Sequence, residues 1–428
     1  MQKIPPSDKI RQRIIDLLNN GLEGEEDITT YLFRLGAERL IQEMLEQEVT
    51  DYLGRERYQR RHPGQEHRGY RNGYEPGRVD TAEGELQVQV PQVRAAATTY
   101  RSQLMSFLRG NSDVLERLVV EMYARGLSTR DIEDALEEAT GTRLLSRTAV
   151  SELTDSLWQE YEAFSQRDLS GFEVEYLFLD AVYESLRQQG GGKEGILCAW
   201  TICADGRRLM LHLALGNKES YQNWLDFLRD MLRRGLRMPV LITTDGAPGL
   251  IRAVEEVFGK SLRQRCLAHK IRNVLGKVPD NAHQEVKAAV QAAYYAPDQQ
   301  VAEMIAAQVL DNYQALYPAA MKSFQDDWQA CIAYLRCPRV HHKRIRTTNL
   351  LERSFLEQRR RTKTIPRFFT EKSCLKLVFA TLWRASYSWR SVRMSEFEIQ
   401  QLRLLRRELG LLDDHKPEVC VNSKAVAA

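Results

Sequence analysis

Residues 173–186, EVEYLFLDAVYESL, open a run of three predicted β-strands that decides the fold. The other two are residues 195–206, GILCAWTICADG, and residues 207–216, RRLMLHLALG. Short apolar runs with brief connections between them are typical of strands in one sheet. The sequence therefore predicts a sheet at the centre of the chain.

A helix, a fourth strand and a second helix follow these strands. Residues 221–232 place apolar side chains at helical spacing, PVLITTDG at 239–246 predicts a buried strand, and a further helix runs through Ile251 and Val254. This is the element order of a ribonuclease H-like core, a mixed sheet with helices on its faces. The Ala- and Gln-rich residues 280–335 have helical spacing and predict a helical insertion in that core.

Two aspartates follow apolar strand residues in this region. Asp180 comes directly after residues 177–179, and Asp245 comes after residues 240–244 and before Gly246, which allows a sharp turn. A buried charge is costly without a partner or a use, and two such carboxylates could hold a divalent cation between neighbouring strands. A pair of such ions can activate one oxygen and stabilise the leaving one. Capping of the next helix is the alternative role for each aspartate.

A third carboxylate is expected, and Glu352 is the best candidate. Thr348 or Asn349 can cap a helix, which puts Glu352 on its first turn and on one face with Asn349. Glu357 and Glu371 compete for this role, and spacing alone does not exclude them.

Two stretches of the chain are strongly basic. Residues 336–367 carry eleven Lys and Arg residues against two glutamates, as DNA held beside a metal site requires. Residues 55–78 carry seven arginines against three glutamates, interleaved with tyrosines in an irregular segment. The second pattern suits phosphate contact and base stacking, with a solvated loop as the alternative.

The remaining N-terminal residues predict a helix, a strand and a helical bundle. The helix covers residues 36–53, and a half-buried strand, residues 86–90, stops at Pro91. In residues 113–166, two short helices, a glycine turn and a helix that opens on Arg147 and Thr148 fit a helix-turn-helix. Three-helix packing without DNA is the alternative. The predicted DNA contacts of the whole chain are Arg68, Arg71, Arg147, Thr148, Lys343, Arg344, Arg346, Arg359, Arg360, Arg361 and Lys363.

Several segments resemble the successive motifs of the IS256 (mutator-type) family of bacterial DDE transposases. They are RNGYEPGRV, QVQVPQVR, YARGLSTRDIEDALEE, LFLDAVYESLR, TTDGAPGL, QRCLAHKIRN and IRTTNLLERSFLEQRRRTKTIPRFF. The resemblance implies that Asp180, Asp245 and Glu352 form a catalytic triad that binds two Mg²⁺ ions, with Mn²⁺ able to substitute. It also implies DNA partners, namely terminal inverted repeats and target DNA, and a family that typically joins one end first and passes through a circular intermediate. A homodimer or higher oligomer on DNA is expected.

Cys266 and His269 match the Cys-x-x-His signature of that family. A zinc site would need two more ligands, and no second Cys/His pair has suitable spacing. We expect both to support the active site, together with Asn349 and Arg353, and a core cysteine with a packed histidine is the alternative.

Composition bounds these expectations. The 428 residues carry a formal net charge of +3, and the seven scattered cysteines include no CxxC pair, which favours reduced thiols. No apolar run approaches the ~20 residues that cross a bilayer, and the N-terminus lacks an apolar signal core. We therefore expect a cytoplasmic, nucleoid-associated bacterial protein without membrane contact.

The predicted fold class is α/β, a ribonuclease H-like catalytic core interrupted by an all-helical insertion and preceded by a mainly helical DNA-binding region. The predicted domains are an N-terminal helix with a small basic β region (1–110), a helix-turn-helix-like domain (111–170), the first part of the core (171–278), the insertion (279–340), the last part of the core with Glu352 (341–395) and a C-terminal helix and tail (396–428). The C-terminal helix is a core element or a dimer contact. The predicted function is transposition of an insertion sequence; a nuclease without strand transfer and a non-catalytic DNA-binding regulator are the alternatives.

Overall fold

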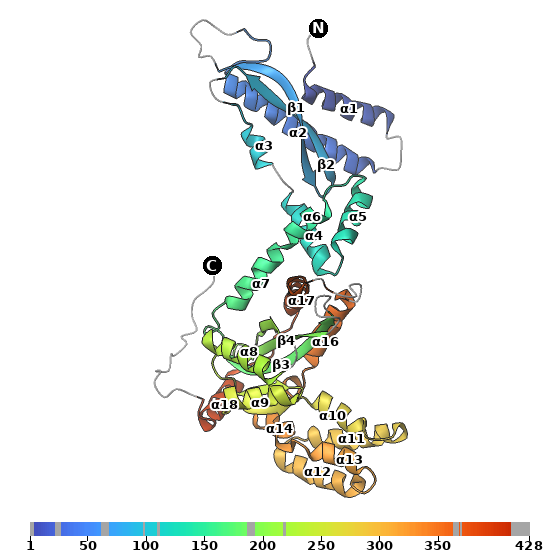
Figure 1. Cartoon of the computed structure of the whole chain (residues 1–428), viewed down its shortest axis with the longest axis vertical. Helices are drawn as coiled ribbons and strands as arrows, with labels where there is room; N and C mark the ends of the chain where they lie inside the picture. Colours follow the sequence, from blue (N-terminus) through green and yellow to red (C-terminus); the bar gives the residue numbers. More distant parts are fainter. Residues whose placement is uncertain are drawn as a thin grey trace. The chain divides into compact units, whose positions relative to one another are not determined.

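The chain forms two compact units, Met1–Ser156 and Leu157–Ala428, each with its own apolar core (Figure 1). The computed structural model describes residues 4–21, 27–60, 68–96, 99–108, 112–185, 193–216, 220–362, 368 and 370–411; the side chains of residues 193, 194 and 349–353 lie outside this description. In the described part of the chain, none of the helices is long and apolar enough to span a membrane.

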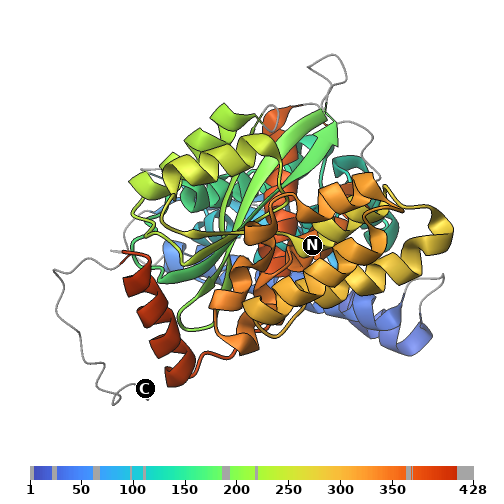
Figure 2. The same ribbon diagram turned by 90° about the horizontal axis from the view of Figure 1, so that it is seen from below.

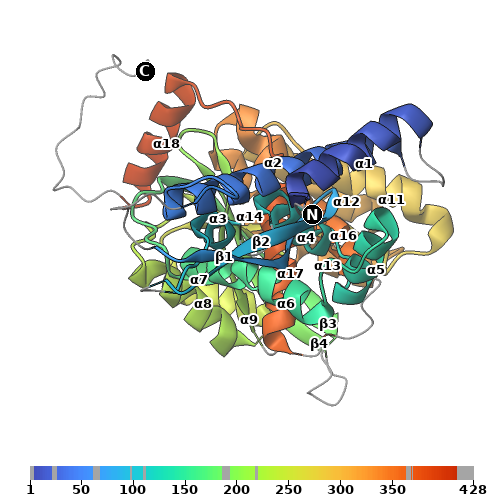
Figure 3. The same cartoon turned by 90° about the horizontal axis from the view of Figure 1, so that it is seen from above.

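The first unit combines helices with a two-stranded antiparallel ribbon. Its elements are α1 Pro6–Asn20, α2 Ile28–Leu53, β1 Tyr70–Thr81, β2 Gly84–Arg94, α3 Gln103–Phe107, α4 Asp113–Ala124, α5 Thr129–Thr140 and α6 Arg147–Thr154. Helices α1 and α2 lie side by side and share a small core that contains Ile10, Leu17 and Leu35 (Figure 3). The predicted helix of residues 36–53 is present and begins earlier, at Ile28.

Helix α2 supplies hydrogen-bond partners for the backbone of β2. The Gln42 side chain, which is fully buried, accepts from the Gln89 N–H at 2.7 Å and donates to the Gln89 carbonyl at 2.9 Å. Glu38 accepts from the Gln87 N–H at 2.9 Å. Polar side chains on the buried face of α2 therefore satisfy backbone groups that β1 does not pair.

The ribbon corrects two expectations. Strand β1 takes in residues 70–78 of the basic stretch expected to be irregular, and β2 continues beyond Pro91 to Arg94. Pro91 faces Tyr74 across the ribbon, next to a shift in register between Arg71 and Tyr74. A proline is tolerated at such an edge or irregularity because it lacks only the N–H that a central strand would need.

Helices α4, α5 and α6 form the predicted three-helix bundle. The Ser128–Asp131 capping box starts α5, and Gly141 ends it in the left-handed conformation. The core of the bundle is made by residues that all come from these helices and the α5–α6 connection: Leu115, Val119, Ile132, Leu136, Leu144, Leu145 and Val150.

The second unit is built on a five-stranded mixed sheet. Its strands are β3 Val174–Ser185, β4 Lys193–Cys203, β5 Arg208–Leu215, β6 Leu241–Thr244 and β7 Leu262–Arg265, in the spatial order β5-β4-β3-β6-β7. Strands β3, β4 and β5 pair antiparallel, whereas β6 and β7 continue the sheet parallel to β3. The central sheet is thus confirmed, but β7 was not predicted.

The remaining elements of this unit are helical. They are α7 Ser156–Gln166, α8 Tyr221–Arg233, α9 Pro248–Val257, α10 Leu267–Leu275, α11 His283–Tyr294, α12 Gln299–Tyr313, α13 Pro318–Gln325, α14 Trp328–Ile332, α15 His342–Ile345, α16 Asn349–Thr362, α17 Glu371–Ser386 and α18 Glu396–Glu408, with 3-10 turns at Asp280–Ala282, Ala333–Arg336 and Arg339–His341. The helices of the insertion, yellow to orange in Figure 2, gather at one side of the sheet.

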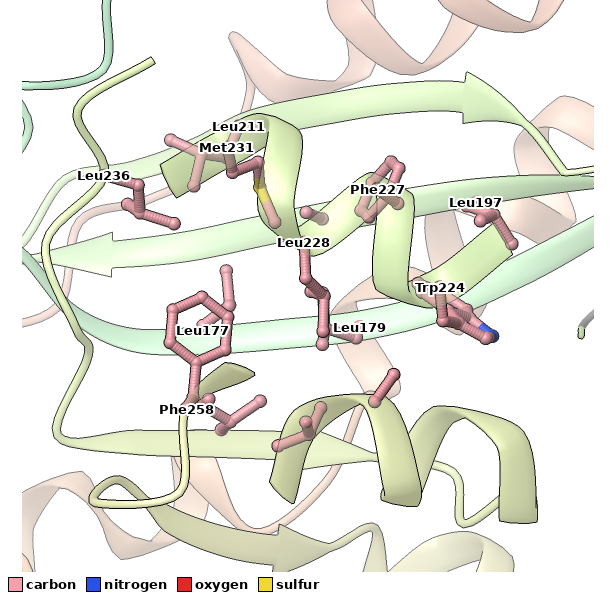
Figure 4. Packing of buried hydrophobic residues seen from close by; sticks show 14 of the residues in the cluster. Leu177, Leu179, Leu197, Leu211, Trp224, Phe227, Leu228, Met231, Leu236 and Phe258 are labelled. Atoms are coloured by element: carbon pink, nitrogen blue, oxygen red, sulfur yellow. The ribbon is translucent and has the colours of Figure 1, made fainter. Parts of the chain in front are cut away.

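The main core of the unit lies between one face of the sheet and the helices α8 and α9. Trp224 and Leu228 of α8 belong to one buried cluster with Leu177 and Leu179 of β3, and Figure 4 shows Leu228 beside Leu179. Because side chains alternate along a strand, residues 176, 178 and 180 point to the opposite face. There the Tyr176 hydroxyl lies 2.7 Å from His341 Nδ1.

The C-terminal helix α18 packs on the same unit. The Arg406 guanidinium donates to the Glu175 carboxylate at 3.1 Å and to the carbonyls of Val174 and Met238 at 2.6 and 2.9 Å. Leu402 and Leu405 are buried. The helix is therefore part of the folded unit, and Gly410 follows it in the left-handed region.

Candidate active site

The two aspartates lie at one level of neighbouring parallel strands. The last pairs between β3 and β6 join Phe178 to Thr243 and Leu179 to Thr244, so Asp180 and Asp245 each follow by one residue. Asp180 is 8% exposed and receives the Ala181 N–H at 2.9 Å. Asp245 is partly exposed, and its carboxylate accepts a hydrogen bond from the Ala247 N–H at 3.0 Å, as aspartates in turns commonly do.

Asp180 is not the last residue of its strand. Strand β3 continues to Ser185, because β4 pairs with it as far as Ser185 and Lys193. What ends at Asp180 is the pairing with the much shorter β6. Asp180 therefore lies one residue beyond the pairing with β6, while β4 pairs with it through Cys198 on the other side.

Gly246 meets a requirement that the sequence predicted. It follows Asp245 with φ +95°, a backbone conformation that only glycine adopts readily. Any Cβ at this position would also overlap the guanidinium of Arg265, the last residue of β7. The sharp turn after β6 thus brings an arginine side chain against the residue next to Asp245.

The chain segment that leads into α16 is fastened to the sheet face opposite α8. The Thr243 hydroxyl donates to the Ile345 carbonyl at 2.7 Å, and the Leu267 N–H donates to the Arg346 carbonyl at 3.0 Å. Thr243 is a neighbour of Phe178 on the face that also carries Asp180. Residues 345 and 346 therefore lie beside the end of β6, which is close to Asp245 in sequence, and on the face that carries Asp180.

Cys266 makes the last of these connections. Its side chain is fully buried, and its Sγ accepts from the Thr348 N–H at 3.4 Å and from the Thr348 hydroxyl at 3.3 Å. Burial raises the pKa of this thiol, but hydrogen bonding and charge from His269, with the hydrogen bond from Thr348, outweigh it and lower the pKa. Cys266, His269 and Thr348 therefore form one cluster, with no second Cys/His pair beside it among the described residues.

The far end of α16 is held by β3. The Glu184 carboxylate accepts from the Gln358 amide and, at 3.0 Å, from the Thr362 hydroxyl. Beyond α16, the Phe368 N–H donates to the Ser185 carbonyl at 2.9 Å. Hydrogen bonds at both ends thus fix α16 on the sheet that carries the aspartates.

Glu352 lies in the first turn of α16, four residues after Thr348. The side chains of Asn349, Glu352 and Arg353 lie outside the described residues, so the structure brings the helix, rather than the carboxylate itself, to the aspartates. The competitor Glu357 lies on the same helix and pairs with Arg360 at 2.7 Å, and Glu371 opens α17. Among described side chains, no group of three His, Cys, Asp or Glu could hold a metal.

The predicted DNA contacts of the first unit differ in how their side chains are used. Arg71 donates to the Thr50 hydroxyl at 2.8 Å and to the Arg55 and Glu56 carbonyls at 3.1 and 3.3 Å. Arg147, exposed at the start of α6 beside Thr148, donates to the buried Glu133 carboxylate at 2.7 Å. Arg68 precedes β1 and also has an interaction within the protein.

The predicted DNA contacts of the second unit are more exposed. Lys343 and Arg344 are exposed on α15, and Arg359 and Arg360 are exposed on α16. Arg346 is partly buried, with its guanidinium 3.7 Å from the centre of the Tyr295 ring, and Arg361 is partly buried as well. Lys363 lies outside the described residues.

Sequence reasoning missed several residues that assemble the site. Gln264 of β7 is fully buried, donates to the Cys331 carbonyl at 3.0 Å and accepts from the Tyr334 N–H at 2.8 Å. It joins the helical insertion to the sheet. Thr243, Arg265 and Glu184 were missed from the sequence as well, because each contacts a residue that is distant in sequence. The one signal in the sequence is that each lies in or next to a quoted motif.

Together, the fold and the site define an α/β protein in which two aspartates lie level on neighbouring strands and a basic helix is fastened to the same sheet. The family model described as "Transposase, Mutator family" matches residues 16–392. The chain therefore belongs to the mutator family of transposases, as its motifs indicated.

Curated relatives cover nearly the whole chain. The transposase for insertion sequence element ISRM5 of Rhizobium meliloti is 32% identical over 82% of this chain and 86% of its own length. The transposase for IS406 of Burkholderia multivorans is 34% identical over 87% of this chain and 93% of its own. The transposase for IS256 in transposon Tn4001 of Staphylococcus aureus is 28% identical over 81% of this chain and 88% of its own.

Proposed function

We propose that this chain is the transposase of an insertion sequence, which binds the terminal inverted repeats and catalyses metal-dependent cleavage and transfer of DNA strands. The observation that carries the proposal is the placement of Asp180 and Asp245 at one level of β3 and β6, on the face where α16 is fastened. The strand order, three antiparallel strands followed by two parallel ones, supports a ribonuclease H-like core.

The residues at this edge suit magnesium. Mg²⁺ prefers carboxylate oxygens and keeps positions for phosphate oxygens, and Asp180 is a buried carboxylate that such an ion would compensate. Asp180, Asp245 and Glu352 would hold two Mg²⁺ ions. When bound, the ions supply positive charge at the attacking and leaving oxygens of an in-line displacement.

The chain's own groups would position the DNA for this chemistry. Lys343, Arg344 and Arg359 are exposed cations on the helices before and at the site, and they would bind phosphates on both sides of the scissile bond. A water oxygen then bonds to phosphorus at the element end while the bond to the 3′ oxygen breaks, which frees a 3′-hydroxyl. That hydroxyl attacks a target phosphate, displacing a 3′ oxygen in turn, and no protein–DNA bond forms.

Strand cleavage and strand transfer on inverted-repeat DNA with Mg²⁺ or Mn²⁺ test the proposal. We expect Asp180→Asn, Asp245→Asn and Glu352→Gln each to reduce cleavage by more than the roughly 10–100-fold typical of residues that only support metal ligands, while DNA binding persists. Asp226→Asn, which changes an exposed residue of α8, should retain activity.

Three outcomes would refute parts of the proposal. Normal cleavage by Asp245→Asn would remove the assignment of the triad. Cleavage without any strand-transfer product would show a nuclease instead of a transposase. Equal cleavage of matched and scrambled repeats would contradict recognition of the inverted repeats.

A further inference from the structure

One buried residue links the strand that ends before Asp245 to the helix that carries Glu352. The Cys266 N–H donates to the Thr244 carbonyl at 2.7 Å, and Thr244 directly precedes Asp245. The sulfur of the same residue accepts hydrogen bonds from the backbone N–H and the hydroxyl of Thr348, the residue directly before α16. The backbone of Cys266 therefore holds one acidic position, and its side chain holds the approach to another.

The connection is short in sequence on both sides. Glu352 follows Thr348 by four residues, about one helical turn. Fixing the amide and hydroxyl of Thr348 therefore fixes the end of the helix to which Glu352 belongs. The bonds from Thr243 and Leu267 hold residues 345 and 346, but Cys266 alone of the described side chains bonds the residue next to the helix.

Cys266 also differs from the cysteines that only fill the core. Burial raises the pKa of the thiols of Cys198, Cys203, Cys331 and Cys337. Cys266 is equally buried, yet hydrogen bonding and charge from His269, with the hydrogen bond from Thr348, outweigh burial and lower the pKa of its thiol.

We propose that Cys266 is a positioning residue of the catalytic centre, which sets the separation of Asp245 and Glu352 by bonding Thr244 through its backbone and Thr348 through its sulfur. The proposal rests on the proposed function in taking these two carboxylates as metal ligands. In this proposal the Cys-x-x-His segment positions other residues, because His269 and Thr348 both donate hydrogen bonds to the Cys266 sulfur.

The test compares the full-length protein with Cys266→Ala, Cys266→Ser, Thr348→Val and the control Cys203→Ala. Cys203 is a buried cysteine at the end of β4. Three quantities are measured: hydrogen exchange of backbone amides in residues 346–353, Mn²⁺ affinity by electron paramagnetic resonance, and the Mg²⁺ concentration that half-saturates DNA cleavage.

We expect Cys266→Ala to weaken Mn²⁺ binding and raise the half-saturating Mg²⁺ concentration by about 10–100-fold, the usual effect of losing a partner that orients a ligand. Exchange at the start of α16 should accelerate, while affinity for DNA stays unchanged. Cys266→Ser keeps an acceptor and should recover part of the loss. Thr348→Val removes only the hydroxyl donor and should have a smaller effect; Cys203→Ala should have none.

Parental metal affinity and parental exchange in Cys266→Ala would overturn the proposal, as would an equal loss in Cys203→Ala. If Cys266→Ala does not fold, Thr348→Val decides by the same measurements, and an unchanged Mn²⁺ affinity overturns the proposal. Failure of the proposed function gives a different result: Asp245→Asn retains cleavage, while exchange in Cys266→Ala still reports whether the sulfur holds α16.

Discussion

The two basic stretches of this protein, residues 55–78 and 336–367, look alike in sequence and are used differently. In the first, Arg71 bonds Thr50 and two backbone carbonyls, Arg55 donates to the Gly69 carbonyl at 2.8 Å, and Arg78 pairs with Asp80 and Glu85. Arg55 and Arg71 thus join the end of α2 to the start of the ribbon, and Arg78 forms ion pairs within the ribbon.

In the second stretch the cations are displayed on short helices. Lys343, Arg344 and Arg359 are exposed, and the helix that bears Arg359 is fastened to Glu184 of β3 and to Cys266. The comparison teaches that two stretches of similar arginine density differ in use: in one the guanidinium donors bond the protein's own groups, and in the other several cations remain exposed. The variants below separate these two uses of charge.

The largest expected effect is on the pH dependence of unfolding. It concerns the histidines of the second unit, two of which, His341 and His342, lie in the second basic stretch. Burial is the main cause that lowers the pKa of His341 and His342, and it lowers that of His212 in the same unit strongly. An unfolded chain has histidines with the ordinary pKa of about 6.5, so below that pH it binds protons that the buried histidines of the folded unit do not bind. Falling pH therefore favours unfolding.

We therefore expect the free energy of unfolding of this unit to fall as the pH drops from 7 toward 5, by up to about 1.4 kcal/mol per pH unit for each histidine that stays neutral. Chemical unfolding at a series of pH values measures this slope. His341→Gln, which can still bond Tyr176 and the Arg393 carbonyl, should flatten it; an unchanged slope would show that His341 is not a buried neutral group.

Reversing exposed charge beside the site should have the next largest effect. Lys343→Glu combined with Arg344→Glu should weaken DNA binding by about 10–100-fold and reduce the slope of log affinity against log salt by about two, since each lost phosphate contact removes about 0.9. Stability should not change. The control is Lys287→Glu with Lys322→Glu, two exposed lysines of the insertion; an equal loss there would mean that net charge, not position, governs binding.

Removing Arg71 should act on stability. Arg71→Met leaves the Thr50 hydroxyl and two carbonyls without this donor, so we expect a loss of about 1–2 kcal/mol in the unfolding free energy of the first unit. Arg60→Met changes an exposed arginine of the same stretch and should leave stability unaltered. If Arg71→Met weakened DNA binding without destabilising the unit, the distinction between the two stretches would fail.

Arg78 should have the smallest effect. Its side chain is 58% exposed, and its contacts with Asp80 and Glu85 measure 3.4 and 3.3 Å. Exposed ion pairs contribute little, so Arg78→Met should change unfolding by less than about 0.5 kcal/mol. A loss as large as that of Arg71→Met would indicate that the pair with Asp80, which is 8% exposed, is a buried interaction.

Strong local patterns made much of the fold predictable. The Ser128–Asp131 capping box predicted the start of α5, and apolar runs predicted β3 and β6. Such signals are contained within a few neighbouring residues, so the sequence alone reveals them. Strands β1 and β7 escaped prediction. Leu262–Arg265 reads LRQR, and only pairing with β6 and the burial of Gln264 make it a strand.

The sequence by itself determined which residue types stand where: two aspartates after apolar strands, a glutamate inside a basic segment, and motifs that identify the mutator family. The tertiary structure decided which of them meet. Register placed Asp180 level with Asp245, and hydrogen bonds across 82 and 102 positions brought α16 to the same sheet face. It also decided which arginines remain exposed, because donors are assigned by neighbours that only folding brings close.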